Sequence, residues 1–334
     1  MEVLEMPGQF SPIFGELIYT YQGAGEGQVF DAEIYGGSPL TLLGIKRFTG
    51  AERIGVNVSG YLRRKLSPCP IESSGSGFYN GGGRTVRCVV KHDKKSTPVR
   101  IFTAGLRNLF AGELLTMMPL HRNIGRDEKD ELSFVTEGGS YAASFEVKGG
   151  GNISFSTNTS AVPEGVCTFV TDMGRVMSEV AVRGGSPSSC RAVHVRIFGD
   201  GSELAHIIYA IKDNPENAVR LCWLNSTGGI DHFTFQTVVS RQVISSKKKI
   251  ISRQGYTTVS SASETVMELN SGYQPVVVLE GLSEIVASSR VWICRGEGFV
   301  AADIISENVP VHGDTLTCMR LKIRESKVVN FQTF

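Results

Sequence analysis

The stretch that decides the fold is Arg220-Leu-Cys-Trp-Leu-Asn-Ser-Thr-Gly-Gly-Ile-Asp-His-Phe-Thr-Phe-Gln236. Side chains alternate across a β-strand, so Leu221 and Trp223 share one face of a first strand. The Asn-Ser-Thr-Gly-Gly segment that follows is rich in residues that tolerate a positive φ, which is typical of a tight turn. Phe233 and Phe235 then return on one face of a second strand. The stretch therefore predicts a β-hairpin, and nothing in it indicates catalysis.

The rest of the chain repeats this pattern of short alternating segments and glycine-rich turns. The chain has 334 residues, of which 38 are glycine, more than the usual share of about 7%. Pairs and triplets of glycine lie between strand-like segments, and short strands at a spacing of about 8–12 residues mark a sandwich or barrel. The sequence predicts an all-β fold of tandem antiparallel β-sandwich or barrel-like domains, with only one or two short helices.

Changes in polarity along the chain divide it into three sections. The polar and charged segment 119–130 separates the first section from the second. Within the second section, strands are expected at short alternating runs such as 179–183. The third section contains the best candidate for a short helix, around 282–287. The predicted parts are an N-terminal β domain at 1–130, a central β-sandwich domain at 131–240 and a C-terminal β-rich section with a short helix at 241–334.

Charge and hydropathy exclude several classes of partner. The formal net charge is +1, so no large basic surface for nucleic acid is implied, and nucleic acid is not an expected partner. No apolar run approaches the roughly 18 residues of a membrane span, so no membrane segment is expected. The first residues lack the basic and apolar regions of a secretory signal. We therefore expect a chain that is made, and kept or assembled, in a cytoplasm.

Cysteine and histidine spacing gives no metal motif. None of the seven cysteines forms a Cys-x-x-Cys pair, which favours free, buried thiols over a disulfide framework or a zinc site. The six histidines lack His-Glu-x-x-His spacing, and each is expected to be a hydrogen-bonded structural residue. The sequence therefore predicts no catalytic, cofactor-binding or metal-binding residue and no cofactor.

Two charged runs leave alternatives open. Asp127-Glu-Lys-Asp-Glu131 could supply oxygen ligands to calcium, but it lacks the spacing of an EF-hand loop, so a solvated interdomain turn is favoured. Lys247-Lys-Lys249 could contact phosphate groups, but no aromatic residues interleave with it. A turn at the tip of a hairpin, protected by its lysines, is the favoured interpretation.

Three stretches together resemble structural tail proteins of tailed bacteriophages and related prophages. In those proteins a Trp-x-Asn-x-x-Gly-Gly-hydrophobic-Asp-x-Phe-x-Phe hairpin precedes a section in which a short helix leads into an aromatic-bearing strand. The central hairpin of this chain, 221–235, matches that motif and is the most specific of the three stretches. The other two are Ser11-Pro-Ile-Phe14 followed by 54–62, and 266–272 leading to 282–293.

The resemblance implies a non-enzymatic structural protein of the tail tip, baseplate, distal tail or a tail-connecting ring. Its implied partners are copies of itself in a ring and other phage tail proteins. Its implied location is the virion, after synthesis in the cytoplasm of the bacterial host. The C-terminal strand expected at 328–334 is an edge candidate that would pack on a neighbouring subunit. The assembly or core landmarks are Trp223, Phe233, Phe235, Trp292, Phe331 and Phe334.

Two other functions compete with this interpretation. One is a carbohydrate- or receptor-binding β-sandwich module used in host recognition, with Tyr61, Phe78 and Tyr79 as an exposed stacking platform. The other is a β-rich hydrolase that uses two carboxylates, but no such pair can be nominated from the sequence.

Overall fold

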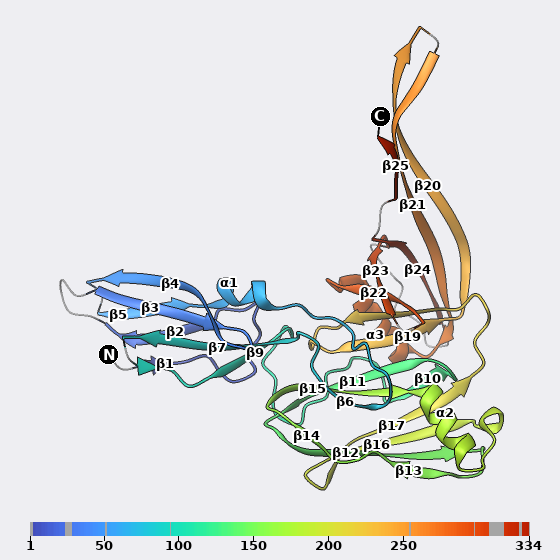
Figure 1. Ribbon diagram of the computed structural model, residues 1–334, viewed down its shortest axis with the longest axis horizontal. Coiled ribbons are helices and arrows are strands. Elements are labelled where there is room, and N and C mark those ends of the chain that lie inside the picture. Colours follow the sequence, from blue (N-terminus) through green and yellow to red (C-terminus); the bar gives the residue numbers. More distant parts are fainter. Residues whose placement is uncertain are drawn as a thin grey trace.

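The computed structural model describes residues 3–23, 29–50, 52–93, 95–253, 255–296, 298–306, 317–326 and 329–333. Its strands form five sheets (Figure 1), and β10 with β17 is the one parallel pair among the strand pairs of these residues. The predicted all-β fold is confirmed. The described residues form three α-helices, whereas the sequence predicts only one or two. The helices are α1 Ser59–Leu62, α2 Met173–Val182 and α3 Val276–Ala287, with 3₁₀ turns η1 Arg63–Lys65 and η2 Pro187–Ser189.

Two sheets close around one core and form the N-terminal sandwich, residues 3–66 and 85–103. One sheet has the strand order β1-β2-β5, and the other has β4-β3-β7-β8 with β9 also paired to β7. Tyr19, Phe30 and Val56 are fully buried between the sheets. The strands are β1 Val3–Glu5, β2 Ile18–Gln22, β3 Val29–Gly36, β4 Thr41–Thr49, β5 Arg53–Asn57, β7 Thr85–His92, β8 Lys95–Ser96 and β9 Arg100–Thr103.

Two further sheets form the central sandwich, residues 77–80 and 121–212. One has the order β11-β15-β6 and the other β10-β17-β16-β12-β13, with β14 also paired to β12. Phe134, Phe145 and Phe169 lie in its core. The strands are β6 Gly77–Asn80, β10 His121–Gly125, β11 Lys129–Thr136, β12 Gly139–Lys148, β13 Ser154–Ser156, β14 Ser160–Val162, β15 Gly165–Asp172, β16 Ala192–Gly199 and β17 Ser202–Lys212.

Helix α2 of the central sandwich overturns the strand that the sequence predicts at 179–183. The side chain of Asp172 accepts a hydrogen bond from the backbone N–H of Arg175 and so caps the helix. The buried residues of the helix are Met173, Val176, Met177 and Val180. Their spacing is that of one helical face. The strand prediction was wrong because a five-residue window does not distinguish alternation from the helical period.

The fifth sheet has eight strands and includes the hairpin quoted at the outset. Its order is β19-β18-β22-β23-β24-β21-β20, with β25 also paired to β21. Helix α3 confirms the predicted short helix and buries Leu279, Leu282 and Ile285 in the core of this sheet. The strands are β18 Val219–Leu224, β19 Ile230–Phe235, β20 Thr237–Ser252, β21 Gly255–Gln274, β22 Val291–Arg295, β23 Gly298–Ile304, β24 Thr317–Glu325 and β25 Val329–Thr333.

The hairpin of β18 and β19, here called the Trp223 hairpin, joins two cores. Its strands pair antiparallel with Trp223 opposite Asp231, which confirms the predicted hairpin. Leu221, Trp223 and Phe235 are buried in the core beneath α3. The alternate residues on the other face, including Cys222, belong to the core of the N-terminal sandwich. The hairpin therefore has no solvated face, which explains why both faces carry apolar residues.

The divisions at residues 130 and 240 stay predictions, and strand pairing crosses both of them. β6 precedes residue 130 but pairs with β15 of the central sandwich. β18 precedes residue 240 but pairs with β22. Sheet membership therefore follows long-range pairing, which changes of polarity along the sequence do not reveal.

The predicted C-terminal strand is present as β25, and its packing on a neighbouring subunit stays a prediction. β25 pairs antiparallel with residues 260–263 of β21 in its own chain, with Phe331 opposite Ser261. The sequence-based expectation placed this strand on a neighbouring subunit. Phe334, the last of the aromatic landmarks, lies outside the described residues.

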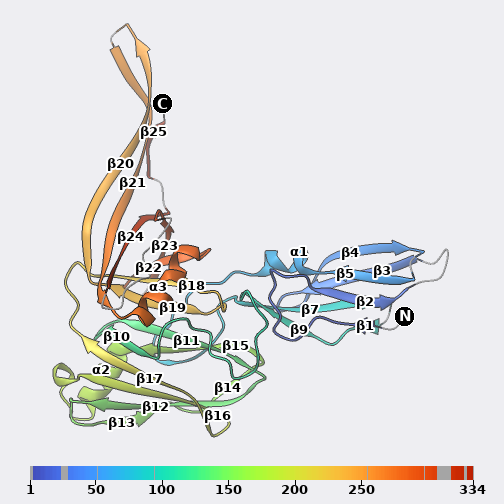
Figure 2. The ribbon, with the colours of Figure 1, turned by 180° about the vertical axis from the view of Figure 1, so that it is seen from behind.

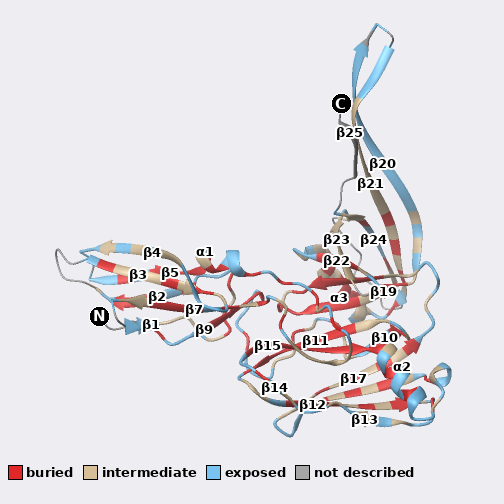
Figure 3. Cartoon of the chain, viewed as in Figure 1, coloured by how far each residue is buried: buried red, intermediate tan, exposed pale blue. Residues whose placement is uncertain are grey.

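The long strands β20 and β21 extend beyond the body of the molecule. β20 pairs with β21 along the whole length of β20, whereas β24 pairs with β21 only from Val266 onward. The outer part, residues 244–253 and 255–264, is here called the projecting ribbon. Figures 1 and 2 show it leaving the sheet in a different direction from the N-terminal sandwich, and Figure 3 shows its outer end as exposed. Lys247–Lys249 lie within β20 and pair with residues 258–261, so the turn expected at these lysines is wrong.

Candidate functional site

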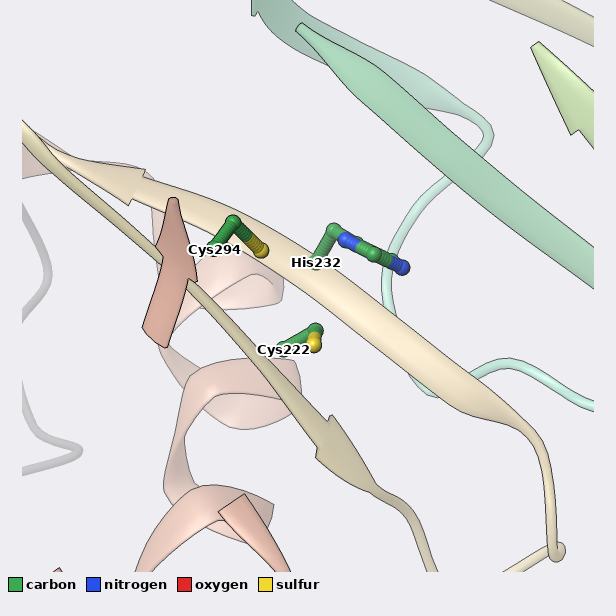
Figure 4. A group of neighbouring side chains, drawn as sticks. All are labelled: Cys222, His232 and Cys294. Atoms are coloured by element: carbon green, nitrogen blue, oxygen red, sulfur yellow. The ribbon is translucent and has the colours of Figure 1, made fainter. Parts of the chain in front are cut away.

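Three side chains with metal-ligating atoms gather on the face of the Trp223 hairpin that meets the N-terminal sandwich. Cys222 of β18 lies directly opposite His232 of β19 and, on its other side, opposite Trp292 of β22. Cys294 follows Trp292 by two residues and so projects from the same face. One ligand atom from each of Cys222, His232 and Cys294 lies within 4.8 Å of the others. Figure 4 shows these three residues, here called the Cys–His cluster, on three adjacent strands.

The imidazole of His232 is buried, and neither of its ring nitrogens makes a hydrogen bond to a described residue. The residue is 4% exposed. Nε2 lies 3.7 Å from Oε1 of Glu131, which is too long for a hydrogen bond. Burial alone would lower the pKa of His232, but the Cys294 thiol and the Glu131 carboxylate raise it to about 9. Buried polar groups are normally hydrogen-bonded, so this ring requires an explanation.

The two thiols of the Cys–His cluster have opposite acidities. Hydrogen bonding from Cys222 lowers the pKa of Cys294, and the adjacent His232 lowers it further, against the effect of burial. Burial raises the pKa of Cys222. Cys294 is therefore the more acidic of the two thiols, and the thiolate is the form of cysteine that binds soft metals or acts as a nucleophile. All seven cysteines are free, as the sequence predicts, and four of them are buried.

A set of buried ion pairs surrounds the cluster on the side of the central sandwich. The pairs are Arg84–Glu131 at 2.6 Å, Arg122–Asp130 at 2.7 Å, Arg220–Glu128 at 3.1 Å and Arg220–Asp130 at 3.1 Å. Glu131 also accepts a hydrogen bond from the backbone N–H of Ile71, which fixes its carboxylate. The solvated turn expected at 127–131 is therefore wrong, because Asp130 and Glu131 are buried in β11 and paired with arginines.

The cluster borders a pocket of about 460 Å³. His232 and Cys294 line this pocket, and Cys222 is fully buried. The pocket wall also carries charges of both signs, among them Arg220 and Glu128. Small molecules or solvent can therefore approach Cys294 and His232 from this side.

Asp231 has an architectural role and does not act on its neighbour His232. Its carboxylate accepts hydrogen bonds from the backbone N–H of Met117 at 2.9 Å and from the side-chain amide of Asn225 at 2.7 Å. Successive residues of a strand point to opposite faces, so Asp231 lies on the Trp223 side of the sheet. β19 is the outermost strand of its sheet, but both residues are buried and Cys294 lies close to His232.

The aromatic landmarks on the described side chains do not form one site. Trp223 and Phe235 are fully buried, and Phe233 packs against the same core. Trp292 is half-buried on the opposite face of the sheet and packs against the core of the N-terminal sandwich. These four residues therefore hold the fold around the hairpin.

The aromatic platform expected for sugar binding is wrong at its central member. Phe78 packs against the core of the central sandwich, with its ring 4.8 Å from that of Phe169 and 5.9 Å from that of Tyr141. Tyr79 is half-buried, and its hydroxyl donates to the carbonyl oxygen of Gly75. Phe78 is half-buried, so its ring is not the exposed stacking surface that the sequence predicts.

The expected structural histidines are confirmed in part. Nδ1 of His194 lies 3.1 Å from Nε2 of His206, and Nδ1 of His92 lies 3.0 Å from the carbonyl oxygen of Asp31. His232 differs, because its nitrogens lack such partners. Motif spacing along the sequence does not reveal the Cys–His cluster, because its three residues lie on three separate strands. The register of the hairpin was the available signal, since it places residues 222 and 232 opposite each other.

Comparison with known proteins does not assign the chain to a family. No protein-family model matches the chain, and no curated protein matches it. Among the described residues, no helix combines the length and hydropathy that crossing a membrane requires.

Proposed function

We propose that this protein is a non-enzymatic structural component of a bacteriophage tail, at the tail tip, the baseplate or a tail-connecting ring. It acts through assembly with copies of itself and with other tail proteins. It is made in the cytoplasm of the bacterial host and ends in the virion. The observation that carries the proposal is the projecting ribbon of β20 and β21, whose contacts within its own chain do not account for its length.

An isolated two-stranded ribbon is marginally stable in water and needs a packing partner. Residues 260–263 of the ribbon pair with β25, but the outer end has no third strand among the described residues. Apolar side chains there face solvent: Ile250 is 53% exposed, Ile251 is 77% exposed and Tyr256 is 75% exposed. A group of exposed apolar residues on a projecting element is typical of an interaction surface.

The edge of β20 supports a neighbouring copy of this chain as the partner. β20 is the last strand of its sheet, so its outer edge has no strand partner in the described chain. A strand from an adjacent copy can extend the sheet there by β-augmentation. Lys247–Lys249 lie on this strand, and lysines on an edge limit unspecific pairing. Repetition of one lateral contact around an axis closes a ring.

The buried charges also favour an architectural role. Arg84, Arg122 and Arg220 are each paired with carboxylates in the interior, although Arg220 also lines the pocket beside the Cys–His cluster. Arg220 of β18 pairs with Asp130 of β11, so this ion pair joins the eight-stranded sheet to the central sandwich. A rigid junction is what a subunit needs if its arms must hold fixed directions in an assembly.

Immunogold electron microscopy of tailed particles from a host that carries the gene tests the proposal. An antibody against this chain should label one fixed position along the tail, and quantitative mass spectrometry of the same particles should give several copies per particle. Particles without label, with all of the protein in the particle-free fraction, would contradict the proposal.

A further inference from the structure

We propose that the Cys–His cluster is a zinc site with Cys222, His232 and Cys294 as its protein ligands. Two thiolates and an imidazole form a soft donor set that selects zinc over magnesium or calcium, which prefer oxygen ligands. Three donors from three adjacent strands already converge within 4.8 Å. The inference is independent of the proposed tail function, because it rests on the interior of the sheet rather than on the projecting ribbon.

The geometry of the cluster fits a tetrahedral ion after a small contraction. Zn–S distances of about 2.3 Å and Zn–N distances of about 2.0–2.1 Å place ligand atoms roughly 3.5–3.8 Å apart. The present upper separation of 4.8 Å exceeds this by about 1 Å. Side-chain rotation on fixed strands can supply that shift, because Cys222 and His232 face each other directly across the hairpin.

His232 provides the second, independent observation. Its buried ring has two nitrogens without hydrogen-bond partners among the described residues, although buried imidazoles normally have them. Nε2 faces Glu131 at 3.7 Å, which leaves Nδ1 for the metal. A metal-bound histidine commonly donates its other N–H to a carboxylate, which orients the ring. Arg84 and the backbone N–H of Ile71 hold Glu131 in place for that role.

The charge balance and the pocket complete the site. One zinc ion with two thiolates has no net charge, so its burial avoids an unpaired charge in the interior. His232 and Cys294 line the neighbouring pocket, so a solvent molecule from that pocket would be the fourth ligand of the ion. The ion would tie β18, β19 and β22 together at the place where the two cores meet. Binding displaces protons from the ligands, so the affinity for zinc rises with pH.

Cobalt substitution of the full-length protein tests the site directly. The chain is stripped with a chelator under reducing conditions and titrated with Co²⁺ alone. The expected result is one Co²⁺ per chain, with thiolate-to-cobalt charge-transfer absorption and the visible bands of a tetrahedral ion, both displaced by Zn²⁺. Absence of these bands from folded wild-type protein would overturn the proposal, as would a Cys222–Cys294 disulfide that persists in reductant.

Variants identify the ligands. Cys294→Ser should abolish the charge-transfer band or at least halve it, and Glu131→Gln should weaken zinc binding about 10–100-fold. Cys69→Ser is the matched control, since Cys69 is an exposed free thiol outside the cluster. An unchanged spectrum in Cys294→Ser would contradict the assignment.

A measurement on wild-type protein avoids dependence on the folding of the variants. Zinc should slow alkylation of Cys294 at least tenfold and leave alkylation of Cys69 unchanged. Equal rates for Cys294 with and without zinc would overturn the proposal, even if zinc binds elsewhere on the chain.

Discussion

Nε2 of His232 lies 3.7 Å from one carboxylate oxygen of Glu131, and the other oxygen of Glu131 accepts a hydrogen bond from Arg84 at 2.6 Å. This relationship joins β19 of the eight-stranded sheet to β11 of the central sandwich. The side chains of Glu131 and Arg84 are 2% and 0% exposed, so neither charge can be compensated by water. The contact places the buried carboxylate of Glu131 beside the buried ring of His232, at a distance too long for a hydrogen bond.

Glu131→Gln should lower the free energy of unfolding by about 3–5 kcal/mol, because it leaves the Arg84 guanidinium buried without its carboxylate. Urea denaturation of the chelator-treated protein, followed by circular dichroism, measures the change. Glu179→Gln is the control, since Glu179 and Arg183 form an exposed helical pair. That substitution should change the stability by less than about 1 kcal/mol. Equal effects of the two substitutions would show that the Arg84–Glu131 ion pair does not stabilise the fold more than a surface pair does.

Acid should destabilise the protein through Asp130. Burial raises the pKa of Asp130, but Arg122 and Arg220 outweigh burial and bring the pKa below its ordinary value of 3.8. Because the pKa is lower in the folded than in the unfolded chain, the ionised carboxylate stabilises the fold above about pH 4. That contribution is lost as the pH falls through the folded-state pKa.

Denaturant unfolding at a series of pH values from neutral to acidic measures this effect. Asp130→Asn should flatten the acid limb of the stability curve as well as lower the stability at neutral pH. Asp31→Asn removes a carboxylate that pairs with Arg47 at the surface, and it should leave most of the acid limb in place. An unchanged acid limb in Asp130→Asn would contradict the assignment.

The turn of the Trp223 hairpin should not tolerate a side chain at Gly229. A Cβ at this position would lie 1.8 Å from the carbonyl oxygen of Leu115, and a backbone atom cannot rotate away. Gly229→Ala should therefore cost at least about 1–3 kcal/mol of stability, as overpacking does.

Thermal unfolding compares this variant with Gly60→Ala. Gly60 lies in α1, where an added Cβ meets no atom within 4 Å. Alanine there should leave the stability unchanged or raise it by about 0.5–1 kcal/mol. A Gly229→Ala protein as stable as the Gly60→Ala protein would refute the close packing of the turn on Leu115.

The hairpin also shows how far sequence reasoning reaches. Strand alternation and the Asn-Ser-Thr-Gly-Gly segment were sufficient to predict both strands and the turn. Gly228 has a φ of +86°, which such a segment leads one to expect. Gly229 is needed for a different reason, its approach to Leu115, and that contact depends on a long-range arrangement that turn chemistry does not encode.

The Cys–His cluster likewise depends on a long-range strand pairing that the sequence pattern does not reveal. The hairpin register alone places Cys222 opposite His232, so two of the three members could be paired from the sequence. Cys294 joins them because β22 pairs with β18. The intervening chain contains β20, β21 and α3, and nothing in its pattern specifies that pairing. Local periodicity predicts elements, whereas the site arises from the order of strands in the sheet.

The projecting ribbon should drive self-association through its apolar side chains. Ile251 lies opposite Tyr256 near the outer end of the ribbon. Replacing both with aspartate removes apolar contacts worth about 1.5–3 kcal/mol per buried side chain, so self-association should weaken at least about tenfold. Sedimentation velocity measures the change. Val182→Asp is the control, since Val182 is 83% exposed on α2, away from the ribbon.

The most direct test of assembly is the mass and symmetry of the full-length protein in electron micrographs of purified or particle-bound material. The account predicts a closed ring of identical copies in which the ribbons contact neighbouring subunits, and loss of that ring in the Ile251→Asp, Tyr256→Asp double variant. A wild-type protein that stays monomeric when concentrated and is also monomeric in tail particles would contradict it.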